Sequence, residues 1–454
     1  MLACLVLAAI DPGALTPTTG AVVNSRDART SPNVVLFLTD DQRSDTLGAM
    51  PAVQTLLVRK GTTFTNAMVP TPLCCPSRAT ILTGLYAHHT RVFGNGDIGG
   101  NRFGGWPQFR RRGMEYRTIA TALQRSGYRT GLFGKYLNNF ANQTHAGYKP
   151  PGWDTFTAFR YIRGAYFDYR LSDGSWHGHK PRDYSTDVLA RRADRFIRST
   201  PRDQPLFMYF APFGPHKPYT PAPRHRGAAA GLPSVGAIDL LGGTTPAWKR
   251  GKKPAAIDEV DRVHKAQVET LLSVDDAVRK LMTALKSTGR ARDTLFIFLS
   301  DNGYFWGEHG LLGKDSPYDA GLRIPMVVRW DGQVPAGVTD HRLALNVDLA
   351  GTISRVASAG MTTDGLDLLG SRRRSGFVVE AMDGYGGRPA YCGWRTKKHL
   401  YVRWATGRTE LYNYRTDPRE EHNLAGDLRR AGLKKRMQAH ATKACSPEPP
   451  GFDW

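Results

Sequence analysis

Two segments far apart in the chain have the same pattern of residues. Residues 33–41 read Asn-Val-Val-Leu-Phe-Leu-Thr-Asp-Asp, and residues 294–302 read Thr-Leu-Phe-Ile-Phe-Leu-Ser-Asp-Asn. A continuous apolar run of this length predicts a strand that is buried on both faces, as in a parallel sheet covered by helices. Helical patterns at 187–199 and 265–288 lie between such strands. The sequence therefore predicts an α/β sandwich with a large, mostly parallel central sheet.

Oxygen-bearing side chains follow both apolar runs, namely Asp40 and Asp41 after the first and Asp301 and Asn302 after the second. In a parallel sheet these side chains would meet at the carboxyl edge, where carboxylates repel one another unless a cation is present. A ligand set made only of oxygen favours Ca²⁺ or Mg²⁺. The simpler alternative is that Asp40 and Asp301 only cap the loops that follow. Two matching endings favour the metal site.

Residues 74–84 read Cys-Cys-Pro-Ser-Arg-Ala-Thr-Ile-Leu-Thr-Gly. Because proline is tolerated in the first turn of a helix, we expect Cys74 at a helix N-terminus, where free N–H groups and the dipole favour an anion. Arg78 would lie one turn further along. Taken alone, the two cysteines could equally be a buried pair on a turn.

The whole string resembles the sulfatase signature Cys-x-Pro-Ser-Arg-x-x-x-Leu-Thr-Gly at every fixed position. The resemblance implies that a formylglycine-generating enzyme converts Cys74, and not Cys75, to formylglycine (3-oxoalanine), whose hydrated aldehyde attacks the sulfur of a sulfate ester. It also implies that the modified Cys74 and the four residues Asp40, Asp41, Asp301 and Asn302 bind one ion, usually Ca²⁺, with Mg²⁺ as the alternative. Thr-Asp-Asp-Gln at 39–42 and Gly-Lys-Tyr-Leu-Asn at 134–138 are most similar to the N-acetylglucosamine-6-sulfatase branch.

The resemblance extends to residues that would contact the substrate. Lys135 and Lys314 resemble the two family lysines that bind sulfate, and Arg78 matches the arginine beside the nucleophile. His216, in Pro-His-Lys-Pro, resembles the histidine of the sulfate pocket and is a candidate general acid. His309, in Gly-Glu-His-Gly-Leu, is expected either to line the pocket or to stabilise its loop.

One position departs from the family pattern. Many sulfatases have Lys-Trp-His where this chain has Lys135, Tyr136 and Leu137, so the histidine is missing. The N-acetylglucosamine-6-sulfatase branch has the same Lys-Tyr-Leu-Asn, and Asn138 can donate a hydrogen bond to the substrate. Asn138 cannot act as a base, so proton transfer would depend on His216 and His309.

These features together predict a sulfuric ester hydrolase that acts on sulfated sugars, with the 6-O-sulfate of N-acetylglucosamine as one candidate. A first alternative is a phosphoester or phosphonate hydrolase on the related alkaline phosphatase scaffold, although such enzymes often hold two metals with many histidine ligands. A second alternative is an inactive protein that binds sulfated glycans.

The chain is strongly basic, with a formal net charge of +22 at pH 7. Such a charge attracts polyanions. We expect no nucleic acid partner, because no helix-turn-helix, zinc-finger or RNA-binding signature accompanies the charge. A sulfated glycan would respond to the same field, and a bias toward arginine with no partner is the remaining alternative. Short basic clusters occur at 110–112, 249–253 and 372–374.

The termini differ in character from the middle of the chain. Residues 2–10 are almost wholly apolar and residues 12–21 are rich in small and turn-forming residues, which resembles a leader too short to span a bilayer. We therefore expect export, no membrane span, and three parts: a leader and N-terminus at 1–31, a catalytic domain at 32–371 and a small C-terminal α+β domain at 372–454. The last part resembles the sulfatase C-terminal domain, with four antiparallel strands and a helix. In an oxidising compartment Cys392 and Cys445 could form one disulfide; otherwise both are free.

Two long segments interrupt the alternating pattern of helices and strands. Residues 144–183 are rich in aromatic residues and glycine, and residues 219–260 are rich in Pro, Gly, Ala and Lys. We expect both to be long connections, of the kind that often form lids or binding loops. The aromatic side chains of the first would either stack on sugar rings or pack the connection onto the body.

Overall fold

The computed structural model describes residues 31–96, 103–143, 147–162, 164–236, 243, 245–249, 253–384 and 387–454. The chain divides into Met1–Thr30 and Ser31–Trp454, and the helices and strands of the described residues all belong to the second unit. Apart from Ser31, the expected leader at 1–31 lies outside the described residues. Among the described residues, no helix has both the length and the apolar character needed to cross a membrane.

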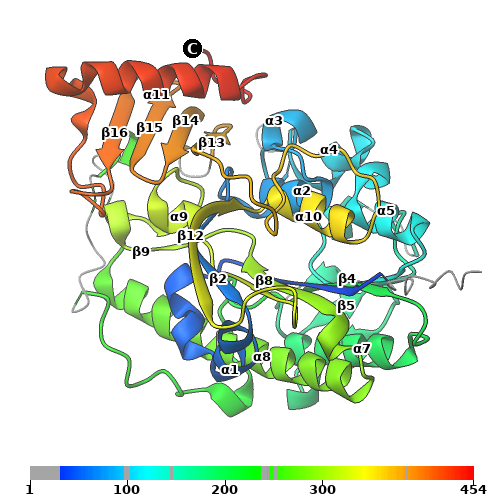
Figure 1. The fold of residues 1–454 in the computed structure, drawn as a ribbon. Helices are drawn as coiled ribbons and strands as arrows, with labels where there is room; N and C mark the ends of the chain where they lie inside the picture. The colour runs from blue at the N-terminus through cyan, green and yellow to red at the C-terminus, as the bar shows by residue number, and fades with distance from the viewer. Residues whose placement is uncertain are drawn as a thin grey trace, which may run out of the picture. The chain divides into compact units, whose positions relative to one another are not determined.

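A ten-stranded mixed sheet forms the centre of this unit (Figure 1), in the order β12-β2-β11-β8-β1-β7-β3-β4-β5-β6. The strands are β1 (Asn33–Thr39), β2 (Thr62–Met68), β3 (Arg129–Gly134), β4 (Thr155–Ile162), β5 (Tyr169–Leu171), β6 (Trp176–His177), β7 (Leu206–Ala211), β8 (Thr294–Ser300), β11 (Met326–Arg329) and β12 (Val338–Leu345). The five consecutive strands β8, β1, β7, β3 and β4 are all parallel. The prediction of a large, mostly parallel sheet is confirmed.

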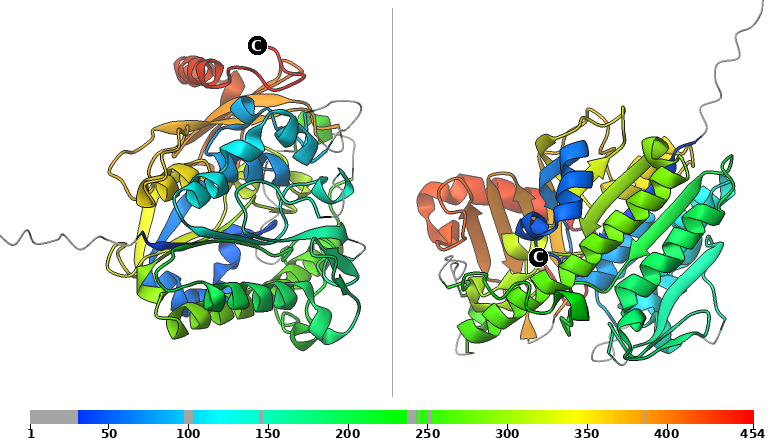
Figure 2. Two further views of the ribbon diagram at one scale, coloured as in Figure 1. Left: turned by 90° about the vertical axis from the view of Figure 1, so that its right-hand side faces the viewer. Right: turned by 90° about the horizontal axis from the view of Figure 1, so that it is seen from below.

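Helices cover both faces of this sheet, as the views in Figures 1 and 2 show. On one face lie α1 (Pro51–Leu56), α7 (Ser185–Ser199) and α8 (Ile257–Ser287); on the other lie α2 (Cys74–Thr83), α4 (Gly105–Arg111), α5 (Ile119–Arg125) and α10 (Asp348–Val356). Successive residues of β1 point to opposite faces, so that Val34 and Leu36 pack in one core cluster and Val35 and Phe37 in the other. Burial on both faces explains why the β1 segment is apolar throughout. The short elements are α3 (Ala87–Thr90), α6 (Phe140–Gln143), α9 (Asp319–Leu322), β9 (Phe305–Trp306) and β10 (Leu312–Gly313).

A separate antiparallel sheet of four strands follows the large one. It consists of β13 (Gly376–Ala381), β14 (Tyr391–Thr396), β15 (His399–Trp404) and β16 (Thr409–Asn413), and α11 (Ala431–Ala444) covers one of its faces. A disulfide joins Cys392 on β14 to Cys445 at the end of α11. The small sheet and helix agree with the expected C-terminal fold, while the boundary at residue 371 stays a prediction. Side chains of β12 and β13 share one core cluster, which joins the two sheets.

Three features of the large sheet were not expected from the sequence. The 144–183 segment is not only a connection, because it contributes β4, β5 and β6 to the large sheet. The strand β11 runs antiparallel to both of its neighbours, β8 and β2. β2 and β12 were not predicted, because neither has an uninterrupted apolar run.

Candidate active site

The acidic ends of β1 and β8 meet at the carboxyl edge of the sheet. The two strands pair in parallel and in register up to Thr39 and Ser300, so the residues that follow are neighbours. The main-chain N–H of Asp41 donates to Asp301 Oδ1 over 3.2 Å, and Asn302 Nδ2 donates to Asp41 Oδ1 over 2.7 Å. Asp41 has φ 67, a left-handed conformation that turns the chain sharply after Asp40. The expected convergence of Asp40, Asp41, Asp301 and Asn302 is therefore present.

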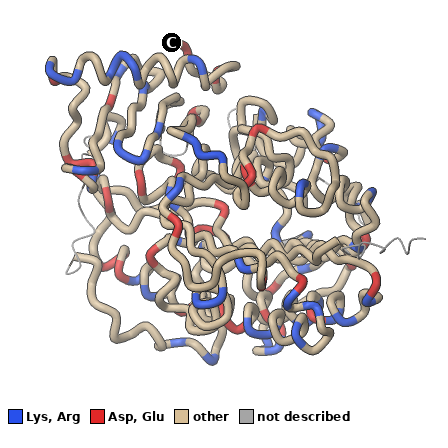
Figure 3. Tube along the Cα trace, in the orientation of Figure 1, with Lys and Arg blue, Asp and Glu red and all other residues tan. Residues whose placement is uncertain are grey.

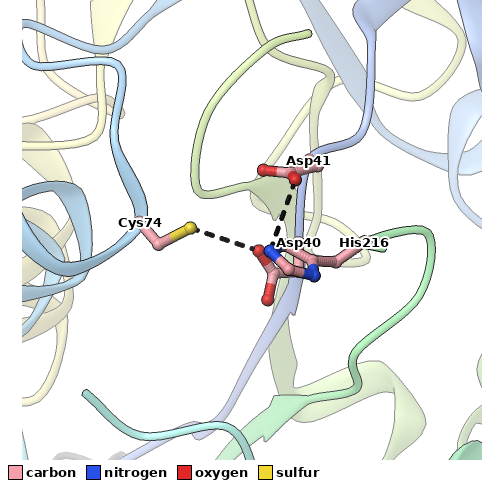
Figure 4. Close-up of side chains that lie close together, drawn as sticks. All are labelled: Asp40, Asp41, Cys74 and His216. Atoms are coloured by element: carbon pink, nitrogen blue, oxygen red, sulfur yellow. Dashed lines mark hydrogen bonds and ion pairs between the residues drawn. The ribbon is translucent and has the colours of Figure 1, made fainter. Parts of the chain in front are cut away.

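The N-terminus of α2 brings Cys74 to these acidic residues. Cys74 is the first residue of the helix, and its Sγ lies 3.5 Å from Asp40 Oδ1. The neighbouring Cys75 donates its main-chain N–H to Asn95 Oδ1 over 2.9 Å and has its side chain in the apolar core. Figure 4 shows the Cys74 thiol directed toward Asp40. Cys75, in contrast, is part of the hydrophobic core.

Four potential ligand atoms are close enough to surround one ion. The ligand atoms of Asp40, Asp41, Cys74 and His216 all lie within 4.8 Å of one another, and the four side chains are drawn in Figure 4. The carbonyl oxygen Oδ1 of Asn302 is buried nearby without a hydrogen-bond partner among the described residues. An unsatisfied buried carbonyl beside several carboxylates is a suitable ligand for a hard cation. These residues thus fit a metal ion on the chemistry of their donor atoms.

The buried Arg78 side chain links the acidic residues that follow β1 and β8. Its Nε donates to Asp301 Oδ2 over 2.8 Å, a second guanidinium nitrogen lies 3.5 Å from Asp40 Oδ2, and a third donates to the carbonyl of Lys135 over 3.0 Å. Burial alone would lower the pKa of Arg78, but Asp301 and Asp40 raise it, so the guanidinium stays charged. Arg78 thus acts as a fixed buried counter-ion for both carboxylates.

Two lysines complete the cationic side of the cluster. Lys135 Nζ lies 2.5 Å from Asp40 Oδ2, and Lys314 pairs with Asp41 Oδ1 and lies 2.7 Å from Cys74 Sγ. Burial lowers the pKa of each lysine, but the adjacent carboxylates outweigh it and raise the pKa above the usual value. The cluster is therefore a set of mutually compensating charges around the Cys74 thiol.

Burial and charge move the carboxyl groups in opposite directions. Burial would raise the pKa of Asp40, but Lys135, His216, Arg78 and Lys314 lower it well below its usual range. At Asp301, burial and the charge of Asp40 raise the pKa to about 6. Asp40, Asp41 and Asp301 are thus matched in number by Arg78, Lys135 and Lys314, but repulsion from the neighbouring carboxylates remains at Asp301, and a divalent ion would relieve it.

A cavity of about 320 Å³ opens beside Lys135 and His216. One part of its wall is aromatic, with Tyr136, Phe140, Phe159 and Phe213, and Asn138 is among the polar lining residues. Asn138 Oδ1 is buried there without a hydrogen-bond partner among the described residues. The sequence indicated Lys135, Asn138 and His216 individually, and Phe159 only as one of the aromatic residues of the 144–183 segment; it did not indicate Phe213. Phe159 lies on β4 and Phe213 follows the end of β7, and their ring centroids are 4.5 Å apart.

His309 lies in a different environment from the other expected site residues. Its ring stacks on Tyr318 with centroids 3.9 Å apart, and its Nε2 lies 3.0 Å from Glu420 Oε2. Of the two roles expected for His309, these contacts favour stabilisation of the loop, which they connect to the C-terminal part of the chain. A catalytic role for His309 stays a prediction.

The Sulfatase family model matches residues 32–359, which include β1, α2 and β8. The matched residues also include the whole Cys74 cluster, by which we mean Cys74 with Asp40, Asp41, Arg78, Lys135, His216, Asp301, Asn302 and Lys314. The chain belongs to the sulfatase family. This confirms the resemblance seen in the Cys74 signature. The human N-acetylglucosamine-6-sulfatase is 35% identical over 357 residues, which cover 74% of this chain and 64% of that protein. The chain covers less than two thirds of the length of the curated relatives that it matches most strongly.

Several solved structures share the fold. One is a protein in complex with its substrate D-glucosamine-2-N,6-O-disulfate, with a TM-score of 0.73 and 22% identity, covering 91% of this chain and 97% of that one. Another is the phosphonate monoester hydrolase of Agrobacterium radiobacter, with a TM-score of 0.68 and 21% identity, covering 91% and 95%. The fold is thus common to proteins that act on different esters, and the reaction must be argued from the site.

Proposed function

We propose that this protein hydrolyses sulfate esters of sugars, with a formylglycine made from Cys74 as the nucleophile. The observation that carries the proposal is the position of Cys74 at the start of α2, with Asp40 on one side and Lys314 on the other. A nucleophile at this point would face a sulfate group held by Lys135, Lys314 and His216. The cations neutralise the sulfate oxygens, which favours the charge distribution of the transition state.

The unmodified thiol is poorly suited to attack. Burial raises the pKa of Cys74 to about 12, although Lys135 and Lys314 oppose the effect. A thiol with so high a pKa is protonated near neutral pH, and the thiol form is not the reactive one. A hydrated aldehyde at the same position would supply a hydroxyl nucleophile. The role of the modifying enzyme during maturation is part of the proposal.

One divalent cation, Ca²⁺ in preference to Mg²⁺, is proposed at the acidic cluster. Asp40, Asp41, Asp301 and Asn302 would hold it through oxygen atoms, and a set of three carboxylates and one amide carbonyl suits Ca²⁺, which takes more protein oxygen ligands than Mg²⁺. Its chemistry would be to bind and polarise oxygen at the position of Cys74. Arg78 would hold Asp40 and Asp301 in place from the opposite side.

The proposed substrate carries a sulfated sugar ring, with N-acetylglucosamine 6-sulfate as the specific candidate. The aromatic wall of the 320 Å³ cavity supplies apolar surface for a sugar face, and Asn138 supplies a hydrogen-bonding group. Burial lowers the pKa of His216, so its neutral form is favoured in the free protein. A bound sulfate anion would raise that pKa and allow His216 to donate a proton to the leaving alcohol.

The decisive experiment is a mass measurement combined with two matched variants. Trypsin would release residues 61–78, which contain both cysteines. In the active protein this peptide should have lost one sulfur and two hydrogens and gained one oxygen, with Cys75 still available to a thiol reagent. Cys74→Ala should release no sulfate from N-acetylglucosamine 6-sulfate, whereas Cys75→Ser should remain active. An unmodified peptide in a fully active protein would overturn the proposal.

Phosphonate ester hydrolysis is the second candidate, because the structure of a phosphonate monoester hydrolase shares the fold. Turnover of an aryl sulfate and of the matching aryl phosphonate would separate the two reactions. We expect the sulfate to be the better substrate, since the relatives named as sulfatases are the more similar in sequence. An inactive glycan-binding protein would turn over neither ester, and its Cys74→Ala variant would bind sulfated sugars as well as the parent does.

An extracytoplasmic location is proposed from the disulfide. The Cys392–Cys445 bond forms and persists in oxidising compartments, and the apolar segment at 2–10 is similar to part of a leader. Alkylation of the protein isolated without reductant should leave Cys392 and Cys445 unmodified.

A further inference from the structure

A second cavity, of about 570 Å³, shares no lining residue with the Cys74 cluster. Three segments form it: residues 340–343 of β12, the connection at 373–375, and the turn at 396–399 between β14 and β15. Five of its lining residues are Lys or Arg, namely Arg342, Arg373, Arg374, Lys397 and Lys398, and Asp340 is the acidic one among them. We call this the basic cavity. Figure 3 shows Lys and Arg positions, in blue, where the small sheet borders the larger body.

One wall of the basic cavity is held rigidly. The pairing of β12 with β2 shifts between Asp340 and Leu343, which takes Arg342 out of the regular register. The Arg342 guanidinium is then fixed by Asp340 Oδ2 at 2.5 Å and by the carbonyls of Leu368 and Gly370 at 3.0 and 3.1 Å. A β-bulge is a common way to aim a side chain at a chosen position.

The charges of the basic cavity do not cancel. Arg342 pairs with Asp340, and Arg374 pairs with Asp348. Over the described part of the chain, Arg373, Lys397 and Lys398 form no ion pair, and all three are exposed. The Arg373 guanidinium donates to the carbonyls of Gly370 and Arg372 at 2.9 and 3.1 Å, so its position is defined without an acidic partner. Three uncompensated cations around one hollow produce a focused positive potential.

Another cavity shows that basic lining residues alone do not produce this imbalance. It has a volume of about 240 Å³ and lies beside His309. Its basic residues Arg43, Arg323 and Arg419 are accompanied by the acidic residues Asp45, Glu308, Asp319 and Glu420. Arg43 is bound to Glu308 and Asp45, and Arg323 to Asp319. That cavity therefore has no excess of cations, whereas the basic cavity has one.

We propose that the basic cavity binds sulfate groups of a sulfated polysaccharide, outside the reacting centre. This inference rests on the proposed function, because it supplies a second point of attachment for the same class of substrate. Arginine binds tetrahedral oxyanions through paired N–H donors, and lysine adds point charges. Two attachment points on one polymer raise the effective concentration of the sulfated chain at Cys74.

The lining favours a sulfated glycan over a nucleic acid. Proteins that bind single-stranded nucleic acid combine basic residues with aromatic side chains on which bases stack. The basic cavity has no Phe, Tyr or Trp among its lining residues. Its rings are the two imidazoles of His341 and His399, which offer less stacking surface than Phe, Tyr or Trp, so the lining provides mainly charge, which suits a flexible chain of sulfated sugars.

The test compares two triple variants that remove the same charge. Arg373→Ala/Lys397→Ala/Lys398→Ala changes the basic cavity, and Arg125→Ala/Lys280→Ala/Lys286→Ala removes three exposed basic residues of α5 and α8. Binding of size-fractionated heparin, of chemically desulfated heparin and of single-stranded DNA would be measured over a range of salt concentrations. Turnover of N-acetylglucosamine 6-sulfate would be measured in parallel.

The basic-cavity variant should bind heparin about tenfold more weakly and with a smaller dependence on salt. The control variant should stay within about twofold of the parent, and turnover of the monosaccharide should not change in either. An equal loss in both variants would overturn the proposal, because binding would then follow net charge alone. If the basic-cavity variant lost affinity for DNA and heparin equally, the cavity would bind polyanions in general and not a sulfated glycan specifically. If the parent releases no sulfate, the proposed sulfatase function fails. The comparison of heparin binding between the two variants still decides whether the basic cavity binds sulfated glycans.

Discussion

Arg78 and Asp301 form an ion pair of 2.8 Å in which both side chains are completely buried. The two residues are 223 positions apart, so the pair joins α2, which carries Cys74, to β8, which carries two of the proposed metal ligands. A buried pair of this kind contributes little when compared with apolar residues, but loss of one partner leaves an uncompensated charge. The pair therefore fixes the geometry of the site more than it stabilises the fold.

Replacement of Arg78 by methionine should lower the free energy of unfolding by about 3 kcal/mol, because Asp301 and Asp40 lose their buried counter-ion. Arg78→Lys keeps a charge but loses the donor to the Lys135 carbonyl, so its loss should be about half as large. Urea denaturation of both variants measures the difference, and sulfate release should fall in both. Equal stability of Arg78→Met and the parent would show that the charges at Asp40 and Asp301 need no partner.

Calcium should stabilise the protein through Asn302. After treatment with a chelator, addition of Ca²⁺ at about a hundred times its dissociation constant should raise the free energy of unfolding by about 2.7 kcal/mol, and Mg²⁺ should give less at the same concentration. Asn302→Leu should remove most of this effect, because it replaces the unpartnered Oδ1 atom with an apolar group.

The matched control for the metal experiment is Glu421→Gln. Glu421 belongs to a second acidic group, with Asp417 and His422, which is the other candidate for an ion among the described residues. The thermal shift produced by Ca²⁺ should be the same in Glu421→Gln as in the parent. If the shift were lost in Glu421→Gln and kept in Asn302→Leu, the ion would bind at the second acidic group and not beside Cys74, which would contradict the proposed metal site.

The sequence was sufficient for the parts of the fold in which local pattern and burial coincide. β1 and β8 are buried at every position, so their apolar runs identify them. β12 lies at an edge of the sheet with its first half mostly exposed, and the apolar residues of β2 are interrupted by polar ones. Neither strand therefore has a continuous apolar run. The strands β4 to β6 were hidden in an aromatic segment whose composition also fits a connection.

The residues of the site likewise divide into those that the sequence could predict and those that it could not. Cys74 and Arg78 lie in one contiguous motif, and the acidic residues follow strands that were predicted, so their convergence could be expected. Phe159 enters the cavity from β4 and Phe213 from the loop after β7, and no local signal distinguishes them from aromatic residues that only pack in the core. The pairing of His309 with Glu420 spans 111 residues and depends on how the C-terminal part packs, which no pattern in the sequence encodes.

The Cys392–Cys445 disulfide should contribute to stability through the chain that it closes. It joins residues 53 positions apart, for which loss of unfolded-state entropy predicts about 4 kcal/mol. Cys392→Ala/Cys445→Ala should lower the unfolding free energy by that amount or more, since the two side chains also pack against Phe452 and Val378 and lose those contacts on truncation. Reduction of the parent should reproduce most of the loss. A reduced protein as stable as the oxidised one would show that α11 is held by packing alone.

His88 on α3 and Glu380 on β13 connect the catalytic part to the small sheet, with Nδ1 2.8 Å from Oε1 and both side chains buried. Burial lowers the pKa of His88, but Glu380 and the more distant Asp364 outweigh it, with Arg91 opposing them, so the pKa in the folded protein is raised above 6.5. The protonated histidine is thus favoured by folding. The stabilisation is fully present below the unfolded pKa of about 6.5 and is lost as the pH rises through the higher folded value.

A double-mutant cycle of His88→Gln and Glu380→Gln would measure this pair directly. The coupling energy should be about 2 kcal/mol at about pH 6, where the hydrogen bond joins two charged groups, and clearly smaller at about pH 9, where the neutral imidazole remains bonded. Urea denaturation at both values gives the four stabilities. The Glu380→Gln single variant is the internal control, because it removes the carboxylate that raises the His88 pKa, and its stability should vary less with pH than that of the parent. A coupling energy that is constant or increases with pH would contradict the raised pKa, because a neutral His88 would then make the same contribution at both values.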